Sequence, residues 1–360
     1  MLHSAPFIIK SLKIYQSSFP NRPKECTINS FLNPEINGFS RKQDVRNLIK
    51  ASLGEFQERL AGLKCLKKSN GDSTATFKAF NLFSGDTISV PADFIILNHH
   101  QPLFKDNVST NFTDSSGTAA HLRSDFAIEK GYLEFIERQS LVHSWLSQNP
   151  GRRISSDHIE SIIKKINSTV EHISFHNISI TKDIFVILTL GYGEKAFSVG
   201  LGSSWSLEEA IKSSFDEFIM IYDGVINFKI NNGEYNTENL YINLFYSKDV
   251  RDFIKDYTYL IENLKYENLD EIDERDIYSE NKQILLRESI STLRENLNIE
   301  VYVTQVPSPF YKNQSKIVKV FSPDAFPHIN TSLYDPHDYK ISKKLAIQEF
   351  PNLYKMIPFA

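Results

Sequence analysis

Five glutamates in three predicted helices are the residues of this sequence best suited to chemistry. Two stretches, Ser52–Arg59 and Gly131–Arg138, share the pattern small-x-x-Glu-Phe-x-Glu-Arg, and Ser214–Phe218 is a shorter copy. The glutamates are Glu55, Glu58, Glu134, Glu137 and Glu217. Each copy places a carboxylate beside bulky apolar residues, where an ionised carboxylate without a partner is costly. Recurring acids in such surroundings favour a shared cation.

Two interpretations of this repeat are open from the residues alone. In the first, an acid pairs with the arginine four positions later on its own helix, Glu55 with Arg59 and Glu134 with Arg138. In the second, the helices converge, and two arginines cannot neutralise five carboxylates. Divalent cations with oxygen ligands, bridging to phosphate oxygens, would then complete the charge balance. The repeat therefore indicates either salt-bridged helices or a metal–phosphate site.

Helical periodicity predicts the elements that position these acids. Apolar residues spaced three and four apart predict one helix over 42–66 and a second over 123–147, which stops before Pro150. A Ser-x-x-Glu capping pattern that starts at Ser206 predicts the third acidic helix, over 207–222. Further helices are predicted at about 155–167, 248–265 and 281–297.

Between the helices, β-rich runs predict strands that follow one another instead of alternating regularly with helices. The runs are 76–83, 87–97, 172–180, 184–190, 196–201, 299–306 and 316–322. This order predicts an α+β fold with largely antiparallel sheets packed with helices, and not a doubly wound fold. Because the chain has no Gly-x-Gly-x-x-Gly and no Walker A loop, a glycine-rich loop is not expected to hold phosphates.

Composition narrows the class of protein. The chain has 360 residues and 41% hydrophobic content, which is enough for one large core or two smaller ones. A net charge of −4 with scattered Lys and Arg does not indicate a basic surface for nucleic acid. Two cysteines make no disulfide framework, and no apolar run approaches the ~20 residues of a membrane span. We therefore expect a soluble cytoplasmic protein with no nucleic-acid or membrane partner.

The motifs resemble those of the YcaO family of ATP-dependent cyclodehydratases. The matching features are Ser52–Arg59, Ser116–Ala120, Glu134–Arg138 and Ala210–Glu217. They follow the order of the family, and the resemblance runs from about residue 45 to the C-terminus. It implies a YcaO-type fold with the ATP site between the acidic helices. It also implies a cyclodehydratase domain over 41–350 and a C-terminal tail over 351–360 that reaches the active site. Before them, several prolines among many polar residues predict an irregular N-terminal extension over 1–40.

The resemblance implies a reaction on a ribosomal precursor peptide. A Cys, Ser or Thr side chain attacks the preceding backbone carbonyl, ATP phosphorylates the resulting oxygen, and loss of phosphate leaves a thiazoline or oxazoline. By position, the five glutamates would hold Mg²⁺, and the carboxylate of Ala360 would act as a base. The residues expected to contact ATP or its phosphates are Ser52, Arg59, Ser116, Gly117 and Arg138.

The resemblance also implies partners and leaves alternatives. The partners would be the precursor peptide, a leader-binding subunit resembling ubiquitin-activating (E1-like) enzymes and an FMN-dependent azoline dehydrogenase, within a bacteriocin synthetase; a homodimer is left open. One alternative is a thioamide-forming YcaO enzyme. The other is a non-catalytic scaffold subunit, because Met220 and Tyr222 stand where family members often carry Gln and Arg, and because Ala360 ends a tail that usually ends in proline.

Overall fold

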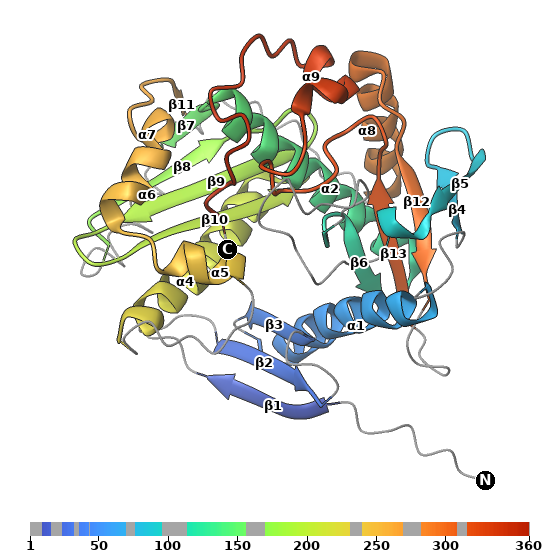
Figure 1. The fold of residues 1–360 in the computed structure, drawn as a ribbon, viewed down its shortest axis with the longest axis horizontal. Helices are drawn as coiled ribbons and strands as arrows, with labels where there is room; N and C mark the ends of the chain where they lie inside the picture. The colour runs from blue at the N-terminus through green and yellow to red at the C-terminus, as the bar shows by residue number, and fades with distance from the viewer. Residues whose placement is uncertain are drawn as a thin grey trace.

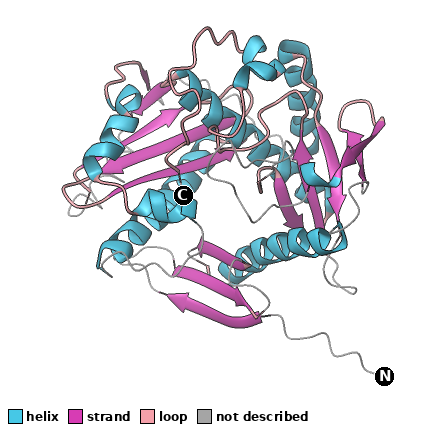
Figure 2. Ribbon diagram, viewed as in Figure 1, coloured by secondary structure: helices cyan, strands magenta, loops and turns pink. Residues whose placement is uncertain are grey.

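The computed structural model describes residues 9–15, 24–31, 36–42, 44–69, 76–95, 114–155, 170–230, 240–268, 282–307 and 315–359. Within these residues the strands form three sheets with helices packed around them (Figure 1, Figure 2). All strand pairs are antiparallel except β7 with β11. The predicted α+β class with largely antiparallel sheets is confirmed.

The three sheets occupy different parts of the molecule (Figure 1). The N-terminal sheet has the order β1-β2-β3, from β1 (Ile9–Tyr15), β2 (Lys24–Ser30) and β3 (Asn37–Lys42). The central sheet, β10-β9-β8-β7-β11, consists of β7 (Arg152–Ser155), β8 (His172–Asn177), β9 (Phe185–Tyr192), β10 (Phe197–Ser204) and β11 (Tyr266–Asn268). The third sheet, β5-β4-β12-β13-β6, consists of β4 (Thr76–Asn81), β5 (Thr87–Pro91), β6 (Thr118–His121), β12 (Tyr302–Val306) and β13 (Lys316–Phe321).

Three long helices carry the predicted acids: α1 (Val45–Ser69), α2 (Ser124–Ser147) and α4 (Leu207–Ile230). Each follows a strand after two linking residues, α1 after β3, α2 after β6 and α4 after β10. The remaining described helices are α5 (Leu240–Tyr246), α6 (Val250–Asp256), α7 (Thr258–Ile261), α8 (Lys282–Leu297) and α9 (Lys340–Lys344), with short 3-10 turns at Ala92–Phe94 and Pro336–Asp338. No helix among the described residues is long and apolar enough to cross a membrane.

The main hydrophobic core lies between the central sheet and helices α2 and α4. Strand β9 is apolar along nearly its whole length and is buried on both faces. Such a continuous apolar run is typical of a strand covered on both sides. A second core lies beneath β4, β5 and β13, and a third joins the N-terminal sheet to α1.

The expectation that residues 1–40 are irregular is wrong for the described part of that region. Strands β1, β2 and the start of β3 lie there. Cys26, Ile28 and Ile36 are fully buried against Phe56 and Leu60 of α1. These buried residues form a narrow apolar face on a sheet whose sequence is otherwise polar. The sheet therefore depends on tertiary packing against α1 and not on strong local β propensity.

Other element boundaries also differ from the predictions. The structure adds β6, β7 and β11 and extends α4 to Ile230. It divides the predicted helix over 248–265 into α6 and α7. In the predicted helix over 155–167, Ser155 is the last residue of β7, and the remainder lies outside the described residues.

Candidate functional site: a carboxylate cluster between three helices

Glu55, Glu134 and Glu217 occupy the same place in three equivalent strand–helix units. Each stands ten residues after the first residue of its helix, which is Val45, Ser124 or Leu207. A small residue precedes each acid by three positions and a phenylalanine follows it. The sequence repeat is therefore a repeat of structure, with the same strand, two-residue link and helix around each acid.

Close packing of helix on strand fixes two of these acids. Glu55 Oε2 accepts a hydrogen bond from the backbone N–H of Phe39 on β3, and Glu217 Oε2 accepts one from Leu201 on β10, both at 2.6 Å.

The glycine before each of these donors permits the contact. A Cβ at Gly38 would lie 2.0 Å from Ser52 O, and a Cβ at Gly200 would lie 2.1 Å from Ser214 O. Only glycine allows the helix backbone this close to the strand, so the strand N–H group can reach the carboxylate.

Glu58 and Glu137, each immediately before an arginine, connect one unit to the next. Glu58 Oε1 accepts a hydrogen bond of 2.6 Å from Ala120 N on β6, the strand that leads into α2. Glu137 accepts one from the backbone N–H of Ser203 on β10, the strand that leads into α4. Four of the five acids are therefore oriented by backbone N–H groups.

The two arginines lie among these acids, as the first interpretation expected. Arg59 Nη2 is 2.6 Å from Glu55 Oε1. Arg138 Nε is 3.9 Å from Glu134 Oε1 and also 3.9 Å from Glu137 Oε1. Arg138 Nη1 is buried and has no hydrogen-bond partner among the described residues. A buried guanidinium N–H group without a partner is a donor set for an anion.

Electrostatic coupling shows that the three helices converge. Burial, together with the charge of neighbouring Glu55, raises the pKa of Glu58 to about 8, although the hydrogen bond from Ala120 N opposes the rise. The pKa of Glu217 is raised to about 7, mainly by burial and also by Glu137 on α2 and Glu55 on α1, although Arg138 opposes the rise. The pKa of Glu134 is raised mainly by burial and also by Glu137 and Glu58. Acids of different helices thus disfavour one another's ionisation, as the second interpretation required.

With all five carboxylates ionised, the two arginines would leave negative charge that a bound cation can balance. Burial lowers the pKa of Arg138, but Glu137, Glu134 and Glu217 raise it more, so the guanidinium stays charged. Among the described residues, no group of three or more His, Cys, Asp or Glu side chains could hold a metal ion. Mg²⁺ usually takes one or two carboxylates and completes its octahedron with phosphate oxygens and water. The donor set therefore fits Mg²⁺ together with a phosphate ligand.

Other predicted site residues have different surroundings. Ser52 is fully buried, and its hydroxyl lies 3.1 Å from both Cys26 O and Leu48 O, so the structure does not bring it to the cluster. Ser116 and Gly117 form the turn before β6. Ala360 lies outside the described residues, but the ring of Phe359 packs 5.4 Å from the guanidinium carbon of Arg138. The end of the described tail therefore reaches the cluster.

Met220 and Tyr222, the departures in the third copy, belong to the hydrophobic core. Tyr222 is 2% exposed and stacks on Phe218 with ring centroids 5.9 Å apart. Met220 is partly buried and packs against the same core. Their side chains fill space around α4, while Glu217 keeps its place in the cluster.

Sequence reasoning missed a second buried ionic group beside Glu134. Lys319 on β13 is 2% exposed, and its Nζ donates a 2.5 Å hydrogen bond to the carbonyl of Asp114. The charge of Asp114 contributes to the raised pKa of Glu134. Burial lowers the pKa of Lys319, although Asp114 and Glu134 oppose this. The sequence feature that could have indicated this group is a single lysine within the otherwise apolar run 317–321.

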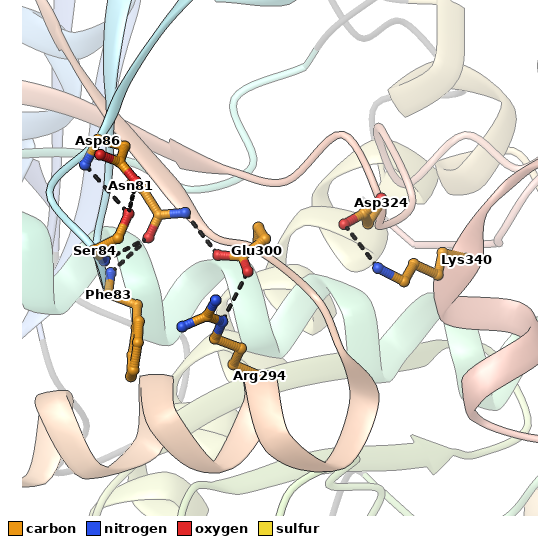
Figure 3. A network of polar contacts seen from close by, with 8 residues as sticks. All are labelled: Asn81, Phe83, Ser84, Asp86, Arg294, Glu300, Asp324 and Lys340. Atoms are coloured by element: carbon orange, nitrogen blue, oxygen red, sulfur yellow. Dashed lines mark hydrogen bonds and ion pairs between the residues drawn. The ribbon is translucent and has the colours of Figure 1, made fainter.

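A separate polar network, outside the carboxylate cluster, fixes the β4–β5 turn (Figure 3). Asn81 Oδ1 accepts hydrogen bonds from the backbone N–H groups of Phe83 and Ser84, and Asn81 Nδ2 donates to Glu300 at 2.6 Å. Glu300 in turn accepts from Arg294 Nε at 2.8 Å. This network attaches the turn to the link between α8 and β12.

A match to a family model identifies the chain's relatives. The model for YcaO cyclodehydratase, described as ATP- and Mg²⁺-binding, matches residues 50–325, which is more than half of the chain. The chain belongs to the YcaO cyclodehydratase family. The expected family is thereby confirmed, and ATP and Mg²⁺ are the cofactors that the family's description gives.

Individual relatives agree with this membership of the YcaO family. The microcin B17-processing protein McbD of Escherichia coli is 28% identical over 280 residues, which is 71% of this chain and 66% of McbD. A chain of the E. coli microcin synthetase McbBCD complex matches the fold with a TM-score of 0.71 and 22% identity, covering 100% of this chain and 98% of that one. YcaO from Methanopyrus kandleri, bound with AMPPCP and Mg²⁺, matches with a TM-score of 0.69 and 12% identity, covering 89% of this chain and 86% of that one.

Proposed function

We propose that this YcaO protein is an ATP- and Mg²⁺-dependent peptide cyclodehydratase whose ATP site lies between α1, α2 and α4. The observation that carries the proposal is the cluster of five coupled carboxylates with two arginines. Arg138 has a buried N–H group with no hydrogen-bond partner among the described residues. Mg²⁺ held by these carboxylates, together with a bound phosphate, would satisfy both features.

The proposed substrate is a ribosomal precursor peptide with Cys, Ser or Thr at the ring positions. The side-chain thiol or hydroxyl would give its proton to a base and add to the preceding carbonyl carbon. The phosphoryl group of bound Mg–ATP would then make the former amide oxygen a leaving group. Departure of phosphate and of the amide proton leaves a C=N bond in a thiazoline or oxazoline. The peptide thereby loses the atoms of one water for each ring.

The chain's own residues contribute positioning and charge neutralisation. We propose that Glu55, Glu58, Glu134, Glu137 and Glu217 hold Mg²⁺. Backbone N–H groups orient four of them, and groups fixed in this way need little reorganisation in the reaction. Arg138 would direct its unpartnered Nη1 toward phosphate, and Arg59 would hold Glu55 in place.

The C-terminal tail over 351–360 is proposed to complete the site. Trp145 Nε1 donates to the carbonyl of Lys355 at 3.0 Å, and the Tyr257 hydroxyl donates to the carbonyl of Pro358 at 2.8 Å. With Phe359 packed on Arg138, these contacts lead the chain end toward the acids. We propose that the Ala360 carboxylate acts there as a base and that the cyclodehydratase domain spans 41–350.

Two of the similar solved structures suggest the setting of the reaction. Solved structures of the E. coli microcin synthetase McbBCD complex, one of them with pro-MccB17 bound, share this fold. We propose that this chain works likewise in an azole-forming bacteriocin synthetase in the cytoplasm. Its partners there would be a leader-binding E1-like subunit and an FMN-dependent azoline dehydrogenase. Cys26, buried and free, is compatible with a reducing compartment.

Mass spectrometry of the precursor peptide tests this proposal. The chain, its partner subunits and the cognate peptide are incubated with Mg–ATP, and the peptide is expected to lose the mass of one water per ring. An exchange of oxygen for sulfur would instead identify a thioamide-forming enzyme. Absence of any ATP-dependent mass change with the cognate peptide would reject the catalytic proposal and favour a scaffold.

A further inference from the structure

Strand β13 holds the turn 114–117 at both ends. Lys319 Nζ donates to the carbonyl of Asp114 at 2.5 Å, and Val320 N donates to the carbonyl of Gly117 at 2.8 Å. The Asp114 carboxylate closes the turn by accepting from Ser116 N at 2.8 Å. Two consecutive residues of one strand therefore fix both the entry and the exit of this turn.

Gly117 is needed for this close contact. Its φ is +73°, in the left-handed region that favours glycine, and a Cβ there would lie 2.1 Å from Val320 O. The turn also touches α2, because a Cβ at Gly131 would lie 2.8 Å from Gly117 O. Gly131 is one helical turn before Glu134. The held turn is therefore adjacent to the segment of α2 that presents Glu134.

The same turn leads directly to a second acid of the cluster. Three residues after Gly117, the N–H group of Ala120 donates to Glu58. A displacement of the turn would thus move the donor that orients Glu58 as well as the surface beside Glu134. Lys319 is 2% exposed, so its ammonium is held inside the protein near these groups and does not extend into solvent.

We propose that Lys319 is a positioning residue for the nucleotide. It fixes the turn 114–117 through the Asp114 carbonyl, so that Ser116 and Gly117 lie against the phosphates. Its positive charge also offsets the negative charge of Glu134. Lys319 acts through the turn and is not assigned a contact with ATP. This inference rests on the proposed function, because it needs the ATP site between the acidic helices.

Steady-state kinetics of the assembled synthetase test the role of Lys319. Lys319→Met removes the donor and the charge, and we expect the KM for ATP to rise by about tenfold or more while the KM for the precursor peptide stays within about twofold. Lys316→Met is the matched control, because Lys316 is an exposed residue of the same strand, and it should change neither constant. Lys319→Arg retains a charged donor and should restore much of the ATP affinity.

Local hydrogen exchange separates positioning from a general loss of stability. Amides of residues 114–120 should exchange faster in Lys319→Met, with the amides of the central sheet unchanged. A purely structural lysine would instead lower the folded fraction and leave both KM values of the folded enzyme unaltered. A folded Lys319→Met enzyme whose KM for ATP stays within about twofold of the wild type overturns the proposal.

A second variant decides the question if Lys319→Met does not fold. Gly117→Ala pushes the turn away from Val320 without changing any buried charge, so it should also raise the KM for ATP, and a folded variant with unchanged KM contradicts the proposal. A wild-type assembly that neither binds ATP nor dehydrates the peptide would reject the proposed function itself. An active wild type with an unaffected Lys319→Met rejects only the role of Lys319.

Discussion

At the residue scale, the acids of the cluster depend on donors that the sequence does not place beside them. The pairs Glu55–Arg59 and Glu134–Arg138 could be predicted, because residues four apart on a helix are neighbours. The backbone donors could not, since Ala120 is 62 residues from Glu58. Residue type and helical spacing therefore identify which acids matter, and tertiary structure decides how each one is oriented.

The charge of Glu217 is expected to be essential for turnover. Glu217→Gln keeps an acceptor for Leu201 N but removes the negative charge, so the fold should persist while peptide cyclodehydration falls by about 100-fold or more. Glu208→Gln, at an exposed position in the first turn of the same helix, should retain activity. Comparable rates for the two variants would remove Glu217 from the proposed metal site.

A buried histidine is expected to make folding sensitive to acid. Burial, aided by the charge of Arg153, lowers the pKa of His176 from 6.5 to about 3. Below pH 6.5 the unfolded chain binds a proton at this ring and the folded chain does not, so stability falls as the pH drops toward 3. The slope for this one residue approaches about 1.4 kcal/mol per pH unit.

Urea unfolding at pH 7 and pH 5 measures this contribution. His176→Gln should lose less stability between the two pH values than the wild type does. His172→Gln, at an exposed position of the same strand, should retain the wild-type difference. An unchanged pH dependence in His176→Gln would show that the ring takes up its proton in the folded state.

At the element scale, the molecule repeats one unit three times. A strand, a two-residue link and a long helix place Glu55, Glu134 and Glu217 at the same position of α1, α2 and α4. The first two helices could be predicted from apolar spacing, with boundaries within a few residues, and the third from its capping pattern. Strand β6 could not, because its residues Thr118–His121 are few and only pairing with β13 makes them a strand. The equivalence of the three units became visible only with all three strands known.

Close contact between strand and helix is expected to be sensitive to one methyl group. Gly200→Ala would place a Cβ 2.1 Å from Ser214 O and 2.3 Å from Phe218 N, so α4 must move away from β10. We expect a loss of about 1–3 kcal/mol or more in the free energy of unfolding, with Glu217 displaced. Gly54→Ala is the control, because no atom lies within 4 Å of its added Cβ.

The control should change stability in the opposite direction. Gly54 lies inside α1, where alanine is favoured over glycine by about 0.5–1 kcal/mol, so Gly54→Ala should stabilise the protein. Thermal or urea unfolding of the two variants measures both effects. Equal stability of Gly200→Ala and the wild type would contradict the close packing of β10 on α4.

At the scale of the whole molecule, the N-terminal sheet is attached to α4 by a buried ionic contact. Arg41 on β3 has a side chain that is 2% exposed, and its Nη2 lies 2.8 Å from Asp223 on α4 and 2.9 Å from Glu25 on β2. The sequence could not predict this, because nothing local connects Arg41 to a helix that begins more than 160 residues later. The contact holds β3 against α4. It therefore helps to fix the position of Glu55, which β3 orients, relative to Glu217 on α4.

Removing one partner of this ion pair is expected to lower the free energy of unfolding strongly. Replacing both partners with apolar side chains is expected to lower it much less. Arg41→Met leaves Asp223 buried with less positive charge beside it, and should cost about 3–5 kcal/mol in urea unfolding. The double variant Arg41→Met/Asp223→Leu exchanges the ions for apolar side chains and should recover most of that loss. If the double variant were as unstable as the sum of the two single changes, the pair would not be the main contact between β3 and α4.

Calorimetric titration of ATP into this protein tests most directly whether the carboxylate cluster between α1, α2 and α4 is the Mg–ATP site. The account predicts that the assembled wild type binds ATP when Mg²⁺ is present and loses that binding when the metal is chelated. Glu134→Gln, folded to the same extent, should show no magnesium-dependent binding. Binding of Mg–ATP to Glu134→Gln with the affinity of the wild type would contradict the account.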